Sequence, residues 1–228
     1  MTKINIKGPI ISSQQQWIYD YFGIEATSPS KVNKILDSIM TNEDLEIEIN
    51  SSGGDISAGS EIYTTIRGYN KGNKKTNIVG SAFSAGSVVA MASESYMSPT
   101  AMMMIHKVSS GTDGNSDDMD KMSKILKVAD RTVANAYIAK SGMTMKDALK
   151  MMAEETWLTA QQAKDKGLID GIMFENTNTQ FNNSFGNMIP QEIIDKMQTD
   201  KLNNVCKNKL QNEEQLNKNY LEGVLSKW

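Results

Sequence analysis

A serine at position 84 lies in a run of small residues, SAFSAGSVVAMA at 81–92, directly after the strand-like segment TNIVG. AFSAG is an Ala-x-Ser-x-Gly variant of the Gly-x-Ser-x-Gly pattern, in which a sharp strand-to-helix turn exposes the serine hydroxyl. Large neighbours would clash at such a turn, and the backbone N–H of Ala85 can face a developing oxyanion there. The pattern indicates a nucleophilic Ser84, with a close-packed helix start as the alternative.

His106 is the single histidine of the chain. If an imidazole base activates Ser84, it must be this one. Because His106 follows the apolar run MMMI, we expect it at the end of a strand, where it could lean over a neighbouring helix start. A structural histidine beside an apolar strand is the alternative.

The segment SSGGD at 51–55 brings paired glycines to the end of another strand. Its backbone N–H groups could bind an oxyanion or a peptide carbonyl, although an ordinary tight turn also needs glycine for positive φ. A third group must orient the histidine. Several carboxylates near predicted loop or strand ends qualify, and spacing does not choose among them: Asp55, Asp113, Glu154, Glu155 and Asp170.

The elements that must position these groups alternate between strands and helices. Apolar patterns predict strands at 4–10 (an edge strand), 45–49, 76–80 and 101–108 (a buried strand). Together with capping residues they predict a helix capped by Ser28 or Ser30, a helix over 56–66, a helix up to 92 and a long helix over 117–140 ended by Gly142. A short helix from Thr144 and a helix from Thr159 to Gly167, with Gln162 in a capping box, complete the prediction.

This alternation predicts the α/β fold class. Two strand–turn–helix units, at 45–66 and 76–92, each end a strand in a turn of glycines or small residues. In open α/β sheets such turns lie at the carboxyl ends of the strands, where ligands bind. Along the long helix the sequence predicts one apolar stripe, formed by Met119, Met122, Ile125, Leu126, Ala129, Val133 and Ala136.

Composition excludes several classes of protein. The 228 residues carry a net charge of −3 and show no basic stripe, which argues against nucleic-acid binding. A lone cysteine, Cys206, allows no disulfide within the chain and suits the cytoplasm. The N-terminus does not have the pattern of a signal peptide, and no stretch approaches the roughly 18 apolar residues that span a bilayer.

The composition shifts after Phe174. We predict one domain over 1–174, an Asn-rich linker over 175–187 and a partly helical C-terminal tail over 188–228 that does not belong to the main core.

Four motifs follow one another along the chain: EINSSGGDISAG, VGSAFSAGS, MMMIHKV and EETWLTAQQAKDKGLID. Together they resemble the proteolytic subunits of the Clp proteases, Ser-His-Asp peptidases with a ClpP/crotonase-like fold, over roughly residues 2–174. Finer features are similar to the phage-encoded branch, the head-maturation (prohead) proteases: GPI near the start, the Trp17 segment followed by FGIEATSPS, GNSDDM after the histidine, and ETWLTA.

The resemblance implies the catalytic roles. It assigns the nucleophile to Ser84 and the general base to His106, in a serine endopeptidase. It assigns the oxyanion donors to the backbone N–H groups of Gly54 and Ala85.

The acid of the triad lies, in the family, two residues before an aromatic-Leu-Ser/Thr-Ala motif. Here that motif is WLTA at 157–160, so the resemblance assigns the acid to Glu155, where cellular members have aspartate. Glutamate can play the same role. Asp170 is the fallback acid, with a family-typical structural role as its alternative.

Two further departures concern the substrate. SSGG replaces Ser-Pro-Gly-Gly, and the loop HKVSSGTDG lacks the usual proline and paired glycines after the histidine. The resemblance places substrate along these two segments, with the contacts Gly53, Asp55, Ile56, Ser109, Ser110 and Gly111.

The resemblance also implies a homo-oligomer of two stacked heptameric rings, with the helix over 117–140 between the rings. It implies no metal or nucleotide cofactor, and any ATP use would belong to an AAA+ unfoldase partner. Protein substrates would include capsid or scaffold proteins in the host cytoplasm. Four alternatives remain: a cellular-type Clp proteolytic subunit that works with an ATP-dependent unfoldase, a catalytically silent ring subunit, an acyl-CoA enzyme of the crotonase type, and a Ser-Lys signal-peptide peptidase.

Overall fold

The computed structural model describes residues 1–40, 42–175, 196, 197, 199–201, 203 and 207. The chain divides into two units, Met1–Thr177 and Asn178–Trp228. Those residues of the second unit that the structure describes are helical and exposed. The predicted linker beyond residue 175 and most of the predicted tail, Cys206 included, lie outside the described residues, so the boundary after residue 174 stays a prediction.

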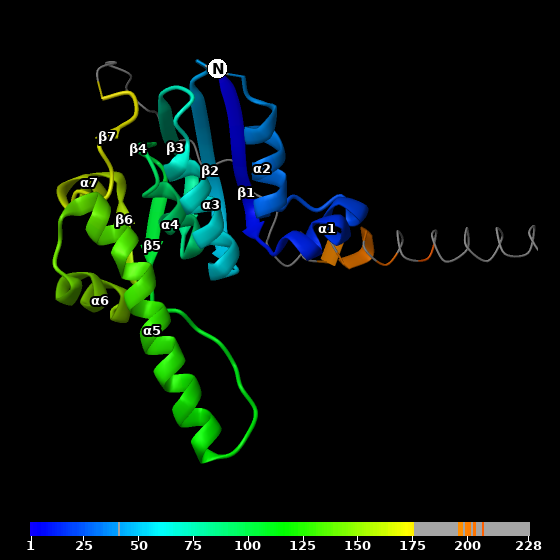
Figure 1. Ribbon diagram of the computed structural model, residues 1–228, viewed down its shortest axis with the longest axis vertical. Coiled ribbons are helices and arrows are strands. Elements are labelled where there is room, and N and C mark those ends of the chain that lie inside the picture. The colour runs from blue at the N-terminus through cyan, green and yellow to red at the C-terminus, as the bar shows by residue number, and fades with distance from the viewer. Residues whose placement is uncertain (41, 176–195, 198, 202, 204–206, 208–228) are drawn as a thin grey trace, which may run out of the picture. The chain divides into compact units, whose positions relative to one another are not determined.

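A seven-stranded sheet organises the described part of the first unit (Figure 1). Its strands follow the order β1-β2-β3-β4-β7, and β5 pairs with both β3 and β6. All pairs are parallel except β5 with β6. The strands are β1 (Thr2–Ile10), β2 (Leu45–Gly54), β3 (Lys74–Phe83), β4 (Glu94–Met97), β5 (Met102–Ile105), β6 (Thr156–Thr159) and β7 (Gly171–Ile172).

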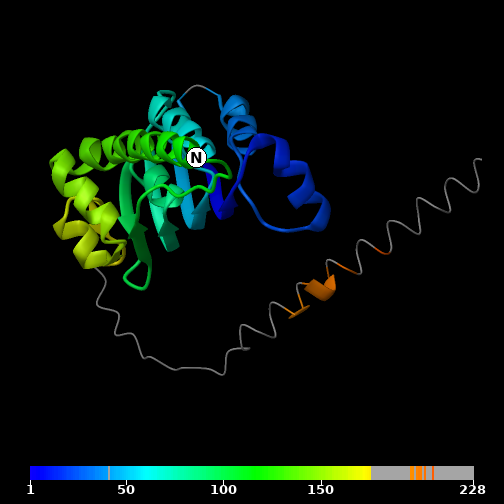
Figure 2. The ribbon, with the colours of Figure 1, turned by 90° about the horizontal axis from the view of Figure 1, so that it is seen from below.

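Helices α2, α3 and α5 lie on one side of this sheet (Figure 2). The strands show the corresponding alternation: Leu45, Ile47 and Ile49 of β2 are buried, whereas Glu46 and Glu48 are partly exposed. The α/β class is therefore confirmed, with the core on the helical side. The helices are α1 (Gln16–Phe22), α2 (Pro29–Ser38), α3 (Ile56–Gly68), α4 (Ala85–Ala90), α5 (Ser116–Ser141), α6 (Met145–Ala153) and α7 (Ala160–Asp165), with a 3-10 turn at Ser13–Gln15.

The helix ends follow local chemistry. Ser28 caps α2 and Thr144 caps α6, in each case by accepting an N–H bond from the first turn. Thr159 and Gln162 form the predicted capping box of α7. Gly142, at φ 73°, ends α5 in the left-handed conformation that glycine adopts without strain. Ser28 is therefore the cap among the two candidates, Ser28 and Ser30, and the predicted helix start at Thr144, the capping box and the glycine stop are confirmed.

The prediction from the apolar run at 101–108 was wrong in part. The strand predicted as buried over 101–108 spans Met102–Ile105 only, and it alternates: Met102 is 50% exposed and Met103 is fully buried. The reason is that β5 has only one face on the core. Four short elements were not predicted from the sequence: helix α1 and strands β4, β6 and β7, which are too short to show a clear apolar pattern.

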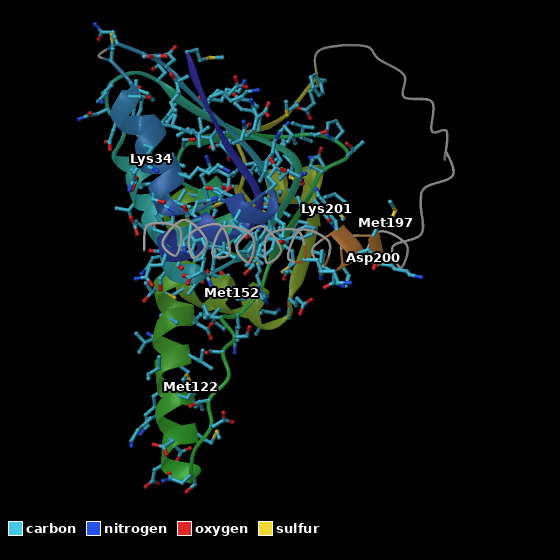
Figure 3. All side chains as sticks on the ribbon, turned by 90° about the vertical axis from the view of Figure 1, so that its right-hand side faces the viewer. Lys34, Met122, Met152, Met197, Asp200 and Lys201 are labelled. Carbon is cyan, nitrogen blue, oxygen red and sulfur yellow. The ribbon has the colours of Figure 1, made fainter. Side chains whose placement is uncertain are left out.

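The stripe predicted along α5 is buried only near its C-terminal end. Val133 and Ala136 are buried there, whereas Met119 and Ile125 are 45% and 59% exposed. Figure 3 shows Met122 on the part of α5 that extends away from the sheet, and Met152 within the body of the unit. At 1.5 Å per residue this helix is about 39 Å long, and only its second half packs on the core.

Two glycines of α3, Gly59 and Gly68, differ in how closely they approach other parts of the chain. A Cβ on Gly59 would lie 2.9 Å from the Cβ of Ala85, whereas a Cβ on Gly68 would meet nothing within 4 Å. We expect Gly59→Ala to lower the free energy of unfolding by about 1–3 kcal/mol through overpacking. We expect Gly68→Ala to raise it by up to about 1 kcal/mol. Urea denaturation of both variants measures this, and equal shifts in the two would contradict the close α3–α4 contact.

Candidate active site

The turn between β3 and α4 holds Ser84 in an unusual conformation. Its φ and ψ are 52° and −121°, a left-handed region that costs a non-glycine residue about 1–3 kcal/mol. The Ser84 N–H donates to the carbonyl of Met104 over 2.9 Å, and the Ser84 carbonyl accepts from the N–H of Ser87 over 2.9 Å. The sharp strand-to-helix turn that the sequence predicts is present.

Close packing explains the small residues around this turn. A Cβ on Gly53 would lie 2.7 Å from the Cβ of Ser84 and 2.6 Å from the carbonyl oxygen of Phe83. The end of β2 therefore lies directly against the turn that carries Ser84. The same turn is crowded on one side and borders a cavity on the other, so close packing accounts for the small residues, and the nucleophilic role of Ser84 stays a prediction.

His106 meets Ser84 across two adjacent strands. The parallel pairing of β3 with β5 sets Phe83 beside Met104, so the residues that follow the two strands are neighbours. Nε2 of His106 lies 2.7 Å from Oγ of Ser84, a hydrogen-bond distance. An imidazole nitrogen at this distance can take the hydroxyl proton as Oγ attacks an electrophile.

A cavity of about 500 Å³ opens over this pair. Its walls include five of the other predicted site residues: Gly54, Asp55, Ile56, Ser109 and Ser110. Two predicted substrate contacts, Gly53 and Gly111, do not line it.

The oxyanion donors that the resemblance implies come from adjacent segments. Ala85 begins α4, and the first N–H groups of a helix lack a partner within the helix. In the described part of the chain no acceptor receives the Ala85 N–H. The Ala85 nitrogen lies close to the glycine pair, since a Cβ on Gly53 would lie 3.1 Å from it. Gly54, with a φ of 143°, packs against β1, because a Cβ at this position would lie 2.1 Å from the carbonyl oxygen of Ile10.

Glu155 lies between α6 and β6, in the neighbourhood of His106. In the antiparallel pairing of β5 with β6 the last pair is Ile105 with Thr156, so His106 directly follows the ladder and Glu155 directly precedes it. Glu155 itself stands outside the ladder, with a positive φ of 48°. The Lys107 N–H donates to the carbonyl of Met152 over 3.1 Å, which holds the two segments together. Glu155 is exposed, and among the described residues no hydrogen bond or ion pair joins its side chain to His106.

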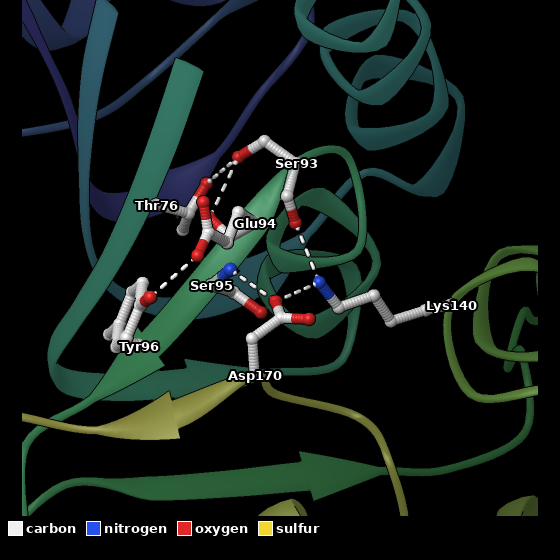
Figure 4. Close-up of polar contacts among 7 residues, drawn as sticks. All are labelled: Thr76, Ser93, Glu94, Ser95, Tyr96, Lys140 and Asp170. Atoms are coloured by element: carbon white, nitrogen blue, oxygen red, sulfur yellow. Dashed lines mark hydrogen bonds and ion pairs between the residues drawn. The ribbon is translucent and has the colours of Figure 1, made fainter. Parts of the chain in front are cut away.

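The other carboxylates that the sequence offers have different partners or positions. Asp170 forms an ion pair with Lys140 and accepts the Ser95 N–H over 2.7 Å, and Lys140 also donates to the Ser93 carbonyl over 2.8 Å (Figure 4). Asp170 thus links α5 to β4. Asp55 caps α3 through the Ala58 N–H at 2.8 Å. Glu154 pairs with Lys150, and Asp113 lies in the loop after β5.

Three residues beside the site were not predicted from the sequence: Ser87, Asp130 and Tyr137. The Asp130 carboxylate accepts the Val108 N–H over 2.8 Å and so fixes the loop after the histidine. Ser87 and Tyr137 form a buried hydroxyl pair below the nucleophile. Helical spacing could have drawn attention to two of them, because Ser87 is three residues after Ser84 and Tyr137 follows the buried Ala136.

Comparison with known proteins decides the family. The sequence profile of the Clp proteases matches residues 26–176, which include Ser84, His106 and Glu155. The chain belongs to the Clp protease family. The Ser84–His106 pair and this membership identify a serine-type endopeptidase, and the sheet with its helical side is the ClpP-like fold that the motifs predict.

Relatives in the family come from several bacteria. The chain is 33% identical over 143 residues to the ATP-dependent Clp protease proteolytic subunit of Deinococcus radiodurans, covering 61% of this chain and 69% of the relative. It is 36% identical over 143 residues to the subunit of Ligilactobacillus salivarius, covering 60% and 71%. It is 30% identical over 131 residues to proteolytic subunit 1 of Chlamydia abortus, covering 55% and 68%.

The described residues contain neither a membrane-spanning helix nor a metal-binding cluster. No helix there is both long and apolar enough to cross a membrane. In the same residues no group of three or more His, Cys, Asp or Glu side chains could hold a metal ion.

Substitution of the two rival acids separates their roles. Because Glu155 lies beside His106, we expect Glu155→Gln to lower kcat for a peptide substrate about a hundredfold or more. Because Asp170 holds Lys140 and the Ser95 N–H, we expect Asp170→Asn to lower the free energy of unfolding by about 1–3 kcal/mol and to leave kcat near wild type. Steady-state kinetics and urea denaturation measure both, and a loss of kcat confined to Asp170→Asn would reverse the assignment.

Proposed function

We propose that the chain is a head-maturation protease of the phage-encoded branch, which cuts capsid or scaffold proteins with Ser84, His106 and Glu155. The 2.7 Å contact between His106 Nε2 and Ser84 Oγ carries the catalytic part of this proposal. The GPI, FGIEATSPS, GNSDDM and ETWLTA segments support the phage part.

The reaction begins at the serine. Ser84 Oγ attacks the substrate carbonyl carbon while His106 Nε2 takes the hydroxyl proton, and the N–H groups of Gly54 and Ala85 bind the oxyanion. His106 then gives the proton to the leaving amine as the C–N bond breaks, which leaves an acyl group on Ser84. Water, with its proton taken by His106, hydrolyses this ester and restores the serine. No metal or nucleotide takes part.

Glu155 orients the imidazole in this mechanism. Glu155 directly precedes β6 and His106 directly follows β5, and in this proposal the exposed carboxylate turns toward Nδ1 of the imidazole. A carboxylate there holds the imidazole in the productive tautomer and stabilises the imidazolium that forms.

Substrate would lie along the two segments that line the cavity. The residues after the glycine pair, Asp55 and Ile56, form one wall, and Ser109 and Ser110 form another. Gly53 and Gly111 border these walls in sequence, and an extended chain between them would pass over Ser84. The exposed half of α5 is consistent with contact between rings, as in the stacked heptamers that the resemblance implies.

The second candidate is a cellular-type Clp subunit that works with an AAA+ unfoldase. The names of the bacterial relatives favour it, because they are ATP-dependent Clp protease proteolytic subunits. The two candidates differ in their substrates. A head-maturation protease would cut capsid or scaffold protein from its own genome without ATP, whereas the cellular type would degrade folded proteins only with an unfoldase and ATP.

A covalent probe tests the catalytic core. We expect a fluorophosphonate to add one adduct to the wild-type protein, and none to Ser84→Ala, because only an activated serine reacts. We expect His106→Ala to lower kcat by a factor of roughly 10⁶. The intact mass of the treated protein and steady-state peptide hydrolysis measure these effects. An unreactive protein that elutes as a complete ring would favour the silent subunit and contradict the peptidase.

A further inference from the structure

A buried pair of hydroxyl groups connects α5 to the nucleophile turn. Oγ of Ser87 lies 2.6 Å from the carbonyl oxygen of Ser84 and 2.8 Å from the phenolic oxygen of Tyr137. Ser87 is fully buried and Tyr137 is 1% exposed. The hydroxyls come from different helices, since Ser87 lies in α4 and Tyr137 in α5.

The directions of these bonds follow from the number of protons. A carbonyl oxygen can only accept, so the single hydroxyl proton of Ser87 points at the Ser84 carbonyl. The remaining bond must then use the proton of Tyr137, which donates to Ser87. Burial raises the pKa of the Tyr137 phenol, which keeps that proton in place. The chain of donors therefore runs from Tyr137 to Ser87 to the Ser84 carbonyl.

This carbonyl belongs to the same peptide group as the Ala85 N–H. In a planar trans peptide the C=O and N–H bonds point in opposite directions, so fixing one fixes the other. The Ser84 carbonyl accepts from the Ser87 hydroxyl and from the N–H groups of Ser87 and Val88, at 2.9 Å and 3.3 Å. The opposite end of this peptide group, the Ala85 N–H, has no acceptor in the described part of the chain.

We propose that Tyr137 is a positioning residue for the oxyanion site: through Ser87 it holds the Ser84–Ala85 peptide group so that the Ala85 N–H points at the developing oxyanion. This inference rests on the proposed peptidase mechanism. Hydrogen bonds in a chain also polarise one another, so donation to the carbonyl strengthens the N–H as a donor. The peptide group needs such support because Ser84 has a strained φ of 52°.

A purely structural role for Tyr137 predicts a different result. Buried hydroxyls find partners in most proteins, so the Ser87–Tyr137 bond could simply stabilise the packing of α4 and α5. Loss of the bond would then lower stability without a specific effect on the transition state. The variants are therefore compared with a buried tyrosine at the other end of the sheet. Tyr69 donates its hydroxyl proton to the carbonyl of Glu43, which precedes β2, whereas Ser84 follows β3.

The experiment uses Tyr137→Phe, Ser87→Ala, the double variant, and Tyr69→Phe as the matched control, all in the full-length chain. Complete removal of an oxyanion donor costs about 10²–10³ in kcat. We expect its misorientation in Tyr137→Phe to cost about tenfold in kcat, with KM within about twofold of wild type. We expect kcat to change and KM to stay nearly constant because the oxyanion forms only in the transition state. Tyr69→Phe should lower the melting temperature about as much as Tyr137→Phe does, and its kcat should equal that of the wild type.

The double variant tests whether the two hydroxyls act as one unit. If Tyr137 acts through Ser87, its removal has no further effect on kcat once Ser87 is alanine, so the double variant should match Ser87→Ala. Independent, multiplying losses would overturn the relay. A wild-type kcat in Tyr137→Phe, with a loss of stability equal to that of Tyr69→Phe, would overturn the positioning role.

Hydrogen exchange gives a readout that does not need activity. We expect faster amide exchange in the segment 84–90 of Tyr137→Phe, because the N–H groups of Ser87 and Val88 donate to the carbonyl that the relay holds, and no change there in Tyr69→Phe. If the wild-type protein elutes as a complete ring and still fails to react with the fluorophosphonate, the proposed function fails. The exchange rates then decide alone: unchanged exchange in Tyr137→Phe overturns the inference.

Discussion

The left-handed backbone of Ser84 is the constraint on which the rest of the site depends. A non-glycine residue keeps such a conformation only when its surroundings hold it from several sides. Here the end of β2 crowds one side through Gly53, and β5 binds the Ser84 N–H through the Met104 carbonyl. The hydroxyl of Ser87, in α4, donates a hydrogen bond to the Ser84 carbonyl. Three separate parts of the fold therefore determine the direction of a single side chain.

The short strands β5 and β6 matter more for chemistry than their length suggests. β3 pairs with β4 along its first half, from Lys75 to Ile78, and with β5 along its last residues, from Ser81 to Phe83. This change of partner extends the sheet beyond β4 and brings His106 to the serine. The antiparallel pairing of β6 with β5 then places Glu155, directly before β6, in the neighbourhood of His106, directly after β5.

Helix α5 joins the site to the rest of the unit. Its buried half contacts three regions: Asp130 fixes the loop after His106, Tyr137 supports the nucleophile turn, and Lys140 pairs with Asp170 beside β4. Its other half extends from the body with apolar side chains exposed. One half of α5 thus contacts the segments around the active site, and the other half presents an exposed apolar surface suited to contact with another subunit.

The sequence by itself determined the features that local chemistry controls. The strand–turn–helix units, the helix caps at Ser28, Thr144 and Thr159, and the small-residue turn at Ser84 depend on residues within a few positions of one another. The order of four motifs was enough to indicate the family, because each motif is itself local. The single histidine also made the partner of Ser84 predictable without any knowledge of the fold.

Only the tertiary structure decided how distant segments meet. Asp170 could be assigned to Lys140, and Glu155 to the neighbourhood of His106, only once strand register was fixed. The Ser87–Tyr137 bond joins residues 50 positions apart, and the exposure of half of α5 depends on where the sheet ends. Apolar periodicity shows which side of a helix can be buried. What covers that side is determined by the packing of the whole unit.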